Sequence, residues 1–495
     1  MEKDKGNYRS IFKATAILGG VQLFNILIGV VRNKIVSLLL GPTGMGIIGL
    51  LQSSTQTVSG FTNCGVSSSS VKNVAQAYED NDFSLLGKVI YSLKRLIACT
   101  GTLAILVMLI LCKQLSQWSF GNNDFAVSFA CLSISLLLTQ ATNAYQTIIK
   151  GCRRVNYYAK SNVFGNFCSL LIAVPLYYVW GKDAIVPVLI LVSASTFIFA
   201  YLYERKVGIK EVHATKEEFK TISVDILKMG IPLALSEVFP LVSSYLIRIF
   251  VSSHGGVADV GLYTAGFAIL NGYVGMIFTA MSSDYIPRLS AIVVDNKECE
   301  ATINSQILLS ILILFPILAV LIPLSKFIVW VLYSDAFIAI SGMICWGALG
   351  MIVKTYNWCY GCILIPKRDS SPYFIFSVIS AFFFYGISIL FYHIWGLTGL
   401  GGGFLASHAC DFIISYIFIS SKYRIRLYKS LLIKLFTFSM TLLIMIVLTT
   451  LFEPSIWVYL VELLIVFGVA LYAFKKLNQI IDISEFFKNK FKRVK

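Results

Sequence analysis

Residues 185–203 read IVPVLILVSASTFIFAYLY, an apolar run without a charged side chain. A helix of about 20 apolar residues is long enough to cross the hydrocarbon core of a bilayer, which is about 30 Å thick. Thirteen further stretches have comparable length and hydropathy, so the sequence predicts about fourteen transmembrane helices. The other thirteen are residues 14–39, 46–70, 96–112, 126–148, 161–180, 229–252, 260–284, 304–323, 338–364, 372–395, 400–420, 431–451 and 456–474.

The composition of the whole chain supports an all-α integral membrane protein. Of its 495 residues 57% are hydrophobic and only 13% are charged, whereas soluble domains carry roughly 25% charged residues. This composition excludes a soluble enzyme, a secreted disulfide scaffold and a disordered chain. The eleven cysteines lie mostly in apolar stretches, where they act as small apolar fillers. Cys359 and Cys362 have neither a second cysteine pair nor histidines at ligand spacing, so we expect no metal site.

The basic residues predict the orientation of the chain. Cytoplasmic loops are enriched in Lys and Arg, and 34 of the 41 basic residues lie on one side if the N-terminus is cytoplasmic. Both termini are therefore expected in the cytoplasm, and the formal charge of +16 is a topology signal rather than a sign of nucleic-acid binding. The basic tail, residues 475–495, lies either against anionic lipid headgroups or free in solvent. Five tryptophans support this topology, because they fall near predicted outer boundaries: Trp118, Trp180, Trp330, Trp395 and Trp457.

An internal repeat divides the chain into similar halves. Gly41 and Gly46 recur as Gly256 and Gly261, and the sequence offset is the same for both pairs. The second copy begins six spans after the first, so both halves have the same orientation, as in transporters that bind substrate at the repeat interface. We predict an N-lobe of six spans, a cytoplasmic linker, a C-lobe of six spans, two additional spans and the basic tail. Their boundaries are 1–203, 204–228, 229–421, 422–474 and 475–495.

Three motifs resemble those of Wzx-type O-antigen translocases, which belong to the multidrug/oligosaccharidyl-lipid/polysaccharide (MOP) exporter superfamily. The first runs from Arg32-Asn33-Lys34 into Leu39-Leu40-Gly41-Pro42-Thr43-Gly44-Met45-Gly46, the second is Phe120-Gly121-Asn122-Asn123-Asp124, and the third runs from Leu332-Tyr333-Ser334-Asp335-Ala336-Phe337 to Lys354. The resemblance covers spans 1–12 in order. It implies two six-helix lobes, related by pseudo-twofold symmetry, around a central cavity that opens alternately to each side.

The resemblance also implies a substrate and a location. The substrate would be an oligosaccharide linked to undecaprenyl pyrophosphate, flipped outward across the bacterial inner membrane. A polysaccharide polymerase and chain-length machinery would be the expected partners besides membrane lipid, and no nucleic acid is expected.

Polar and basic residues inside the spans are the candidate substrate-binding residues. A basic residue at the centre of a membrane helix costs roughly 2.5–3.5 kcal/mol, so it normally faces a bundle interior or a water-filled cavity. Lys354, near the middle of its span with Asn357 one turn on, is the best candidate. The remaining candidates are Gln22, Asn25 and Arg32, which share one helical face, Lys34, which lies outside that face and is placed to extend toward the interface, and Arg248.

A second group of residues suggests coupling or gating. Glu237 shares a helix face with Arg248 and either neutralises a base or acts in coupling. Asp284 and Arg288 form either a local ion pair or a gate, and His408 with Asp411 forms either a proton relay or a structural pair: these four are the other candidates. A proton or a sodium ion would be the coupling ion of a driven exchanger, and no other cofactor is expected.

Two other classes of function compete with a flippase. A drug exporter with the same fold would favour acidic residues in its cavity, whereas four bases and about three acids lie inside these spans. A membrane-embedded polymerase or ligase would need catalytic groups in sizeable outer loops, and the outer loops here are short. The sequence shows no nucleophile–base constellation, phosphate-binding loop or metal cluster, so we expect a transporter rather than an enzyme.

Overall fold

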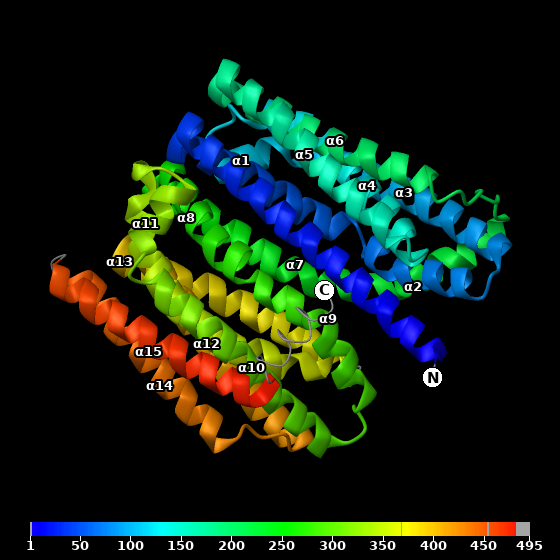
Figure 1. Cartoon of the computed structure of the whole chain (residues 1–495). Coiled ribbons are helices and arrows are strands. Elements are labelled where there is room, and N and C mark those ends of the chain that lie inside the picture. The colour runs from blue at the N-terminus through cyan, green and yellow to red at the C-terminus, as the bar shows by residue number, and fades with distance from the viewer. Residues whose placement is uncertain (1, 368, 453–454, 482–495) are drawn as a thin grey trace, which may run out of the picture. The chain divides into compact units, whose positions relative to one another are not determined.

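The structure is a computed structural model that describes residues 2–367, 369–452 and 455–481, and these residues form helices and connecting loops without a β-strand (Figure 1). The first helices are α1 (Glu2–Thr62), α2 (Val66–Glu79), α3 (Phe83–Phe120), α4 (Ala126–Gly151), α5 (Val155–Trp180), η1 (Gly181–Ala184), α6 (Ile185–Arg205), α7 (Lys216–Gly255), α8 (Val257–Phe267) and η2 (Ala268–Val274). They are followed by α9 (Met276–Ala291), α10 (Asn296–Leu321), α11 (Ser325–Leu332), η3 (Asp335–Ile340), α12 (Ser341–Gly361), η4 (Cys362–Leu364), α13 (Ser370–Tyr423), α14 (Lys429–Leu451) and α15 (Ile456–Ile481).

Eleven of the described helical segments are long and apolar enough to cross a membrane. Two of them, Val155–Arg205 and Ser371–Tyr423, each contain two of the predicted spans, and Gly19–Thr62 overlaps two more, so the structure is compatible with a count of fourteen. The chain is therefore an all-helical, multi-pass membrane protein, as predicted. Residues 482–495 of the predicted basic tail lie outside the described residues.

One predicted span has the wrong boundary. The span expected at 46–70 runs over a break, because α1 ends at Thr62 and α2 begins at Val66. Gly65 at this break has a positive φ of 64°, and a Cβ there would lie 2.1 Å from the carbonyl oxygen of Gly230. The close crossing of α7 thus fixes a turn that hydropathy alone does not reveal.

The described residues form two compact units. Unit 1 lies within Met1–Gly261 and includes Leu332–Ser334, and unit 2 lies within Leu262–Val331 and Asp335–Lys495. This division differs from the predicted lobes, because α7 belongs to unit 1 although residues 229–255 were assigned to the C-lobe. The physical reason is packing within unit 1, where Val238 and Leu241 of α7 lie against Gly60 of α1. Whether six-helix lobes form the working units of the protein stays a prediction.

The repeat is visible in the backbone of both halves. Gly41 (φ 63°, ψ −168°) and Gly256 (φ 84°, ψ 173°) adopt the same conformation, which is essentially restricted to glycine. Gly181 (φ 54°, ψ −127°) and Gly396 (φ 57°, ψ −138°) form a second matching pair at the same sequence offset. The starts of two helix pairs also keep this offset: α4 at Ala126 with α12 at Ser341, and α5 at Val155 with α13 at Ser370.

The two copies of the glycine motif meet in unit 1. A Cβ on Gly46 would lie 1.8 Å from the carbonyl oxygen of Val257, and a Cβ on Gly261 would lie 1.8 Å from that of Pro42. Pro42 and Val257 are themselves related by the offset of the repeat, so each copy makes the same contact with the other. Only glycine allows such close approach of two backbones.

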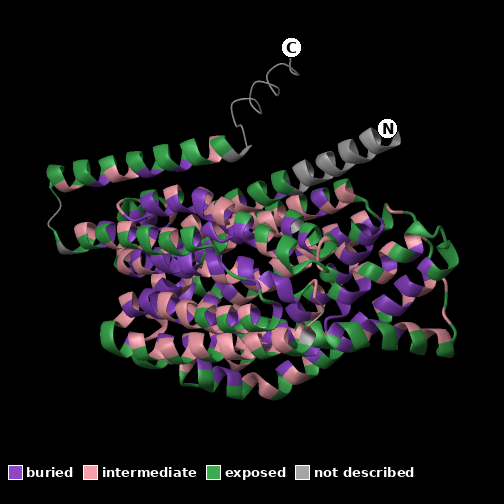
Figure 2. Cartoon of the chain, turned by 90° about the horizontal axis from the view of Figure 1, so that it is seen from below, coloured by how far each residue is buried: buried purple, intermediate pink, exposed green. Residues whose placement is uncertain are grey.

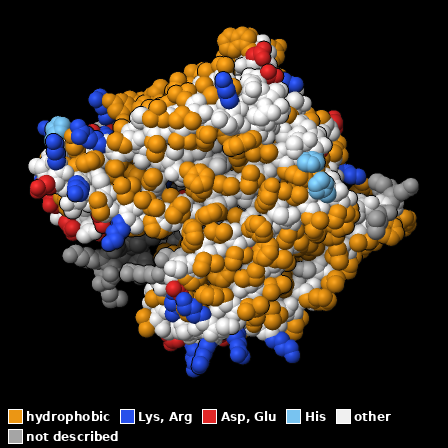
Figure 3. All heavy atoms as spheres, turned by 180° about the vertical axis from the view of Figure 1, so that it is seen from behind, with side chains coloured by type: hydrophobic (Ala, Val, Ile, Leu, Met, Phe, Trp, Pro, Cys, Tyr) orange, Lys and Arg blue, Asp and Glu red, His pale blue; other side chains and the backbone are white. Residues whose placement is uncertain are grey.

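The surface is what a bilayer-embedded chain requires. Many large apolar side chains are exposed, among them Leu27, Ile110 and Tyr178. Figure 2 shows exposed residues on the outer helices, and Figure 3 shows hydrophobic side chains across most of one face, with Lys and Arg gathered toward its margins. The tryptophans predicted at outer boundaries are all exposed at helix ends or kinks: Trp118, Trp180, Trp330, Trp395 and Trp457.

The predicted linker has a defined path. Residues between α6 and α7 lie along the start of α3, where Lys94 Nζ contacts Glu204 at 2.9 Å and Glu211 at 2.6 Å. Thr215 then caps α7, because its hydroxyl accepts a hydrogen bond from the Glu218 amide while the Glu218 carboxylate accepts one from the Thr215 amide. These contacts fasten the linker to unit 1.

The two ends of α13 are joined by Asp369, which lies in the loop before α13 and outside the candidate spans. Its carboxylate accepts hydrogen bonds from Lys422 and Tyr423, and these donors lower the pKa of Asp369. We expect Asp369→Asn to lower the unfolding temperature slightly at neutral pH, since such ion pairs contribute at most about 1 kcal/mol.

The pH dependence of this effect follows from the direction of the pKa change. A lowered pKa in the folded state stabilises above the unfolded value of about 3.9, and this contribution is lost as the pH falls through the folded pKa. Thermal unfolding in detergent should therefore separate wild type from Asp369→Asn at pH 7, and the difference should shrink at acid pH. A difference that grows on acidification would contradict this assignment.

Candidate substrate site within the membrane

The strongest predicted residue, Lys354, lies in a polar and aromatic setting in unit 2. It is half-buried on α12, and its Nζ donates a hydrogen bond of 2.7 Å to Oδ1 of Asn271. The same ammonium lies 5.8 Å from the ring centroid of Phe278 and 5.6 Å from that of Phe404. The two cation–π interactions and the hydrogen bond to Asn271 stabilise the ammonium charge of Lys354 inside a membrane helix.

Asn271 reaches this position because the helix that carries it is locally widened. Residues Ala268–Val274 form a π-helical stretch, and the Gly275 amide donates to the Leu270 carbonyl oxygen at 2.9 Å, which is the i to i+5 spacing of such a turn. A Cβ on Gly275 would lie 2.2 Å from the Asn271 carbonyl oxygen, so glycine is required where the stretch ends. Such π-helical turns are rare and occur frequently at functional sites.

His408 and Asp411 lie beside the Lys354 site. Their Nδ1 and Oδ2 atoms are 3.6 Å apart, and Asp411 is buried and accepts a 2.6 Å hydrogen bond from Ser380 in the first half of α13. The Phe404 ring, which contacts Lys354, also lies 4.5 Å from the His408 ring, edge to face. A cation, an imidazole and a carboxylate thus share one region of unit 2.

Other residues around Lys354 have structural partners. The amide oxygen of Asn357 accepts a 2.9 Å hydrogen bond from Ser415. The Tyr356 and Tyr360 hydroxyls donate to the backbone oxygens of Leu431 and Ile425, so these aromatic residues hold the chain near the start of α14. Packing between helices accounts for the two tyrosines, whereas the role of Asn357 in binding substrate stays a prediction.

The candidates of the first spans lie in unit 1. Gln22 is exposed, the Asn25 side chain accepts a 3.0 Å hydrogen bond from Asn166, and Arg32 is half-buried. Lys34 donates to the carbonyl oxygen of Tyr333, which belongs to the same unit.

The candidates on α7 and α9 have polar contacts near their own helices. Arg248 donates to the Ser244 carbonyl oxygen at 3.0 Å, whereas Glu237 is exposed. Arg288 lies 3.9 Å from Asp284 and donates a 2.8 Å hydrogen bond to Gln306. Both members of the Asp284–Arg288 pair are exposed, as a peripheral ion pair would be.

Sequence reasoning missed four residues of the unit 2 site, namely Asn271, Phe278, Ser380 and Phe404. Asn271 was identifiable in principle as a polar residue in the middle of the span at 260–284. It also missed a cavity of about 360 Å³ in unit 1, which is lined by amide and hydroxyl side chains of α1, α4 and α6. A signal for it was the polar composition of residues 46–70.

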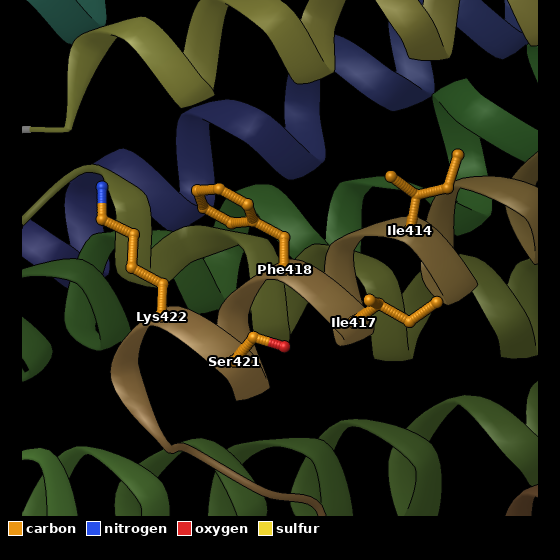
Figure 4. Close-up of a pocket in the computed structure, with 5 residues that line it drawn as sticks. All are labelled: Ile414, Ile417, Phe418, Ser421 and Lys422. Carbon is orange, nitrogen blue, oxygen red and sulfur yellow. The ribbon is translucent and has the colours of Figure 1, made fainter.

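A wide depression of about 610 Å³ runs along α13 (Figure 4). Ile414, Phe418 and Lys422 rise from one side of the helix, at the i, i+4 spacing that places side chains on one face. Ile414, Ile417 and Phe418 make the depression mainly apolar, and the Lys422 ammonium at its end is bonded to Asp369. Among the described residues no group of three or more His, Cys, Asp or Glu is placed to hold a metal ion.

Comparison with known proteins identifies the family. Residues 11–293, more than half of the chain, match the model of the family described as "Polysaccharide biosynthesis protein". The chain belongs to the polysaccharide biosynthesis protein family. Among curated relatives, the lipid III flippases of Escherichia coli (strain K12) and Shigella flexneri are each 22% identical over 378 residues, which cover 75% of this chain and 89% of each relative.

Solved structures share the fold of this family member. The lipid II flippase MurJ in an inward closed conformation has a TM-score of 0.69 at 14% identity, covering 94% of this chain and 99% of MurJ. An inward-facing multidrug resistance MATE transporter of the MOP superfamily has a TM-score of 0.66 at 15% identity, covering 82% of this chain and 98% of that structure. The fold that the resemblance predicts is confirmed, and these relatives are named as flippases and transporters rather than enzymes.

Proposed function

We propose that the chain is a flippase for undecaprenyl-pyrophosphate-linked oligosaccharide, the repeat unit of an O-antigen or a related surface polysaccharide. It would move this lipid by alternating access from the cytoplasmic to the outer face of the bacterial inner membrane. The observation that carries the proposal is Lys354, a base on a membrane-spanning helix whose ammonium is held by Asn271 and two phenyl rings.

The chemistry of the substrate explains why such a base is needed. A pyrophosphate cannot enter hydrocarbon without a large cost for its charges, and sugar hydroxyls cannot enter it without losing hydrogen bonds to water. A cation and amide donors along the path replace water for both groups, while the polyprenyl tail stays in lipid. The names of the lipid III and lipid II flippases support a lipid-linked substrate for a chain of this fold.

A cation-coupled multidrug exporter is the second candidate. It is favoured by the similarity to the MATE transporter and by the buried Asp411, a carboxylate that could exchange a proton or a sodium ion. The arrangement around Lys354 argues against it, because a base near the site repels cationic drugs.

A proposed flippase would also deliver substrate to a polysaccharide polymerase and its chain-length machinery, since these consume the flipped product.

Transport by proteoliposomes tests the proposal. Vesicles containing the full chain are loaded with undecaprenyl-pyrophosphate oligosaccharide, and a membrane-impermeant glycosidase reports the sugar that becomes accessible. A fluorescent cationic drug is measured in parallel, and protein-free vesicles are the control. We expect protein-dependent exposure of sugar without movement of drug. Drug movement without sugar exposure would replace the flippase by an exporter, and a dependence on an imposed proton or sodium gradient would identify the coupling ion.

A further inference from the structure

The cavity of unit 1 occupies the position that the Lys354 site occupies in unit 2. The sequence offset that relates the glycine pairs and the helix starts also relates the residues around the two sites. The matched pairs, with the unit 1 residue first, are Gln56 and Asn271, Gly60 and Gly275, Thr139 and Lys354, Leu189 and Phe404, and Ser193 and His408. All five unit 1 members line the cavity. The two sites are therefore equivalent places in the two copies of the repeat.

The two sites differ in charge. In unit 2 the site holds Lys354, His408 and Asp411. In unit 1 threonine stands at the position of the lysine and serine at that of the histidine, and none of the residues that line the cavity is charged. Thr196 stands at the position that the sequence offset relates to Asp411. A shared framework has thus kept one charged and one neutral site.

The lining of the neutral cavity is arranged in helical stripes. Gln52, Gln56 and Ser59 follow one face of α1, and Thr139 and Asn143 follow one face of α4. Within the part of the chain that the structure describes, the side-chain amides of Gln52, Gln56 and Asn143 have no protein partner. Gln56 and Asn143 are exposed and Gln52 is half-buried, so these amides are accessible to an occupant that can both donate and accept hydrogen bonds.

Apolar side chains line the same cavity between these polar stripes. Leu132 and Leu136 come from α4, Leu189 and Val192 from α6, and Leu241 from α7. Sugar rings combine hydroxyl edges with apolar C–H faces, so a mixed lining of amides and leucines suits them. The volume of about 360 Å³ lies at the lower end of the range of about 300–1,000 Å³ that small-molecule sites occupy. A monosaccharide or a short oligosaccharide fits this size.

We propose that this neutral cavity binds uncharged sugar rings of the lipid-linked substrate. The inference rests on the proposed flippase function and adds a division of labour to it. The lining residues carry no charge. The cavity therefore offers no cation to bind the pyrophosphate and no carboxylate to bind a cationic drug, which disfavours both as occupants. The charged counterpart around Lys354 takes the pyrophosphate. Unit 1 therefore distinguishes a glycosylated lipid from a bare one.

Native mass spectrometry of the full chain in detergent tests the cavity. The probes are undecaprenyl pyrophosphate, the same lipid carrying one glucose, and the same lipid carrying one N-acetylglucosamine. We expect wild type to bind at least one sugar-bearing probe more tightly than the bare lipid. Gln56→Leu and Asn143→Leu, which keep the size of the side chain, are each expected to weaken that binding about three- to tenfold, because each removes hydrogen bonds to the sugar. Neither variant should change binding of the bare lipid.

Two control variants separate the inference from its premise. Gln146→Leu makes the same chemical change on α4, at a half-buried residue that does not line the cavity, and should leave all probes unaffected. Lys354→Met should weaken bare and sugar-bearing lipids alike. Equal loss of all probes in the cavity variants, or unchanged sugar binding, would overturn the cavity assignment while the flippase stands. Failure of wild type to bind any probe would overturn the proposed function and this inference with it.

Discussion

Lys354→Met is expected to reduce translocation of undecaprenyl-pyrophosphate oligosaccharide about 10- to 150-fold. The side chain keeps its length and apolar stem, so the variant removes the charge with little change in packing. A charge-assisted hydrogen bond contributes about 1.5–3 kcal/mol, which sets the size of the effect. The loss falls on the pyrophosphate because Lys354 is the base that Asn271, Phe278 and Phe404 hold in unit 2. The glycosidase-accessibility assay measures it directly.

Lys354→Arg separates charge from shape. An arginine keeps the positive charge and donates to phosphate oxygens in a bidentate manner, so it should retain a substantial part of the activity. Lys326→Met removes an exposed base from α11 and is the matched control, with translocation expected at the wild-type rate. Normal transport by Lys354→Met would end the pyrophosphate role. Equal loss in the arginine and methionine variants would assign Lys354 to packing instead.

The membrane-spanning pattern of this chain follows from hydropathy, because every backbone polar group in a bilayer must be bonded within a helix. That constraint makes long apolar runs a strong signal, and it is why eleven helical segments correspond to the predicted spans. The break between Thr62 and Val66 escaped the prediction. It depends on the approach of Gly230 to Gly65, a contact between residues far apart in the sequence.

The candidate site was predictable in part, for a related reason. A lysine within an apolar run is recognisable from sequence as a candidate functional residue, and this pattern predicts Lys354. Asn271 was recognisable only as a polar residue within the span at 260–284, and its contact with Lys354 was not predictable, because it depends on a π-helical stretch that no hydropathy pattern indicates. Asn357 lies one turn from Lys354, its amide oxygen accepts a hydrogen bond from Ser415, and its contact with substrate stays a prediction. The neutral cavity carries no charge, so only the offset between the repeats relates Thr139 to Lys354.

Gly46→Ala and Gly261→Ala are expected to destabilise the protein strongly and to similar extents. Each new Cβ would lie 1.8 Å from a backbone carbonyl oxygen, of Val257 and of Pro42 respectively. Backbone atoms cannot turn aside as a flexible side chain does, so the helices must separate. Overpacking costs typically about 1–3 kcal/mol and occasionally more. Thermal unfolding in detergent, followed by the yield of monodisperse protein, measures the loss.

The reciprocity of the contact makes this prediction sharper than a simple clash. Either substitution alone forces apart the same two segments, Pro42–Gly46 and Val257–Gly261, so the second adds little once the first is present. The double variant should therefore cost less than the sum of the two single variants. Gly386→Ala on α13, where a Cβ meets no atom within 4 Å, is the matched control and should be neutral or slightly stabilising. Additive costs, or single variants as stable as wild type, would show that the two copies of the glycine motif do not meet in this way.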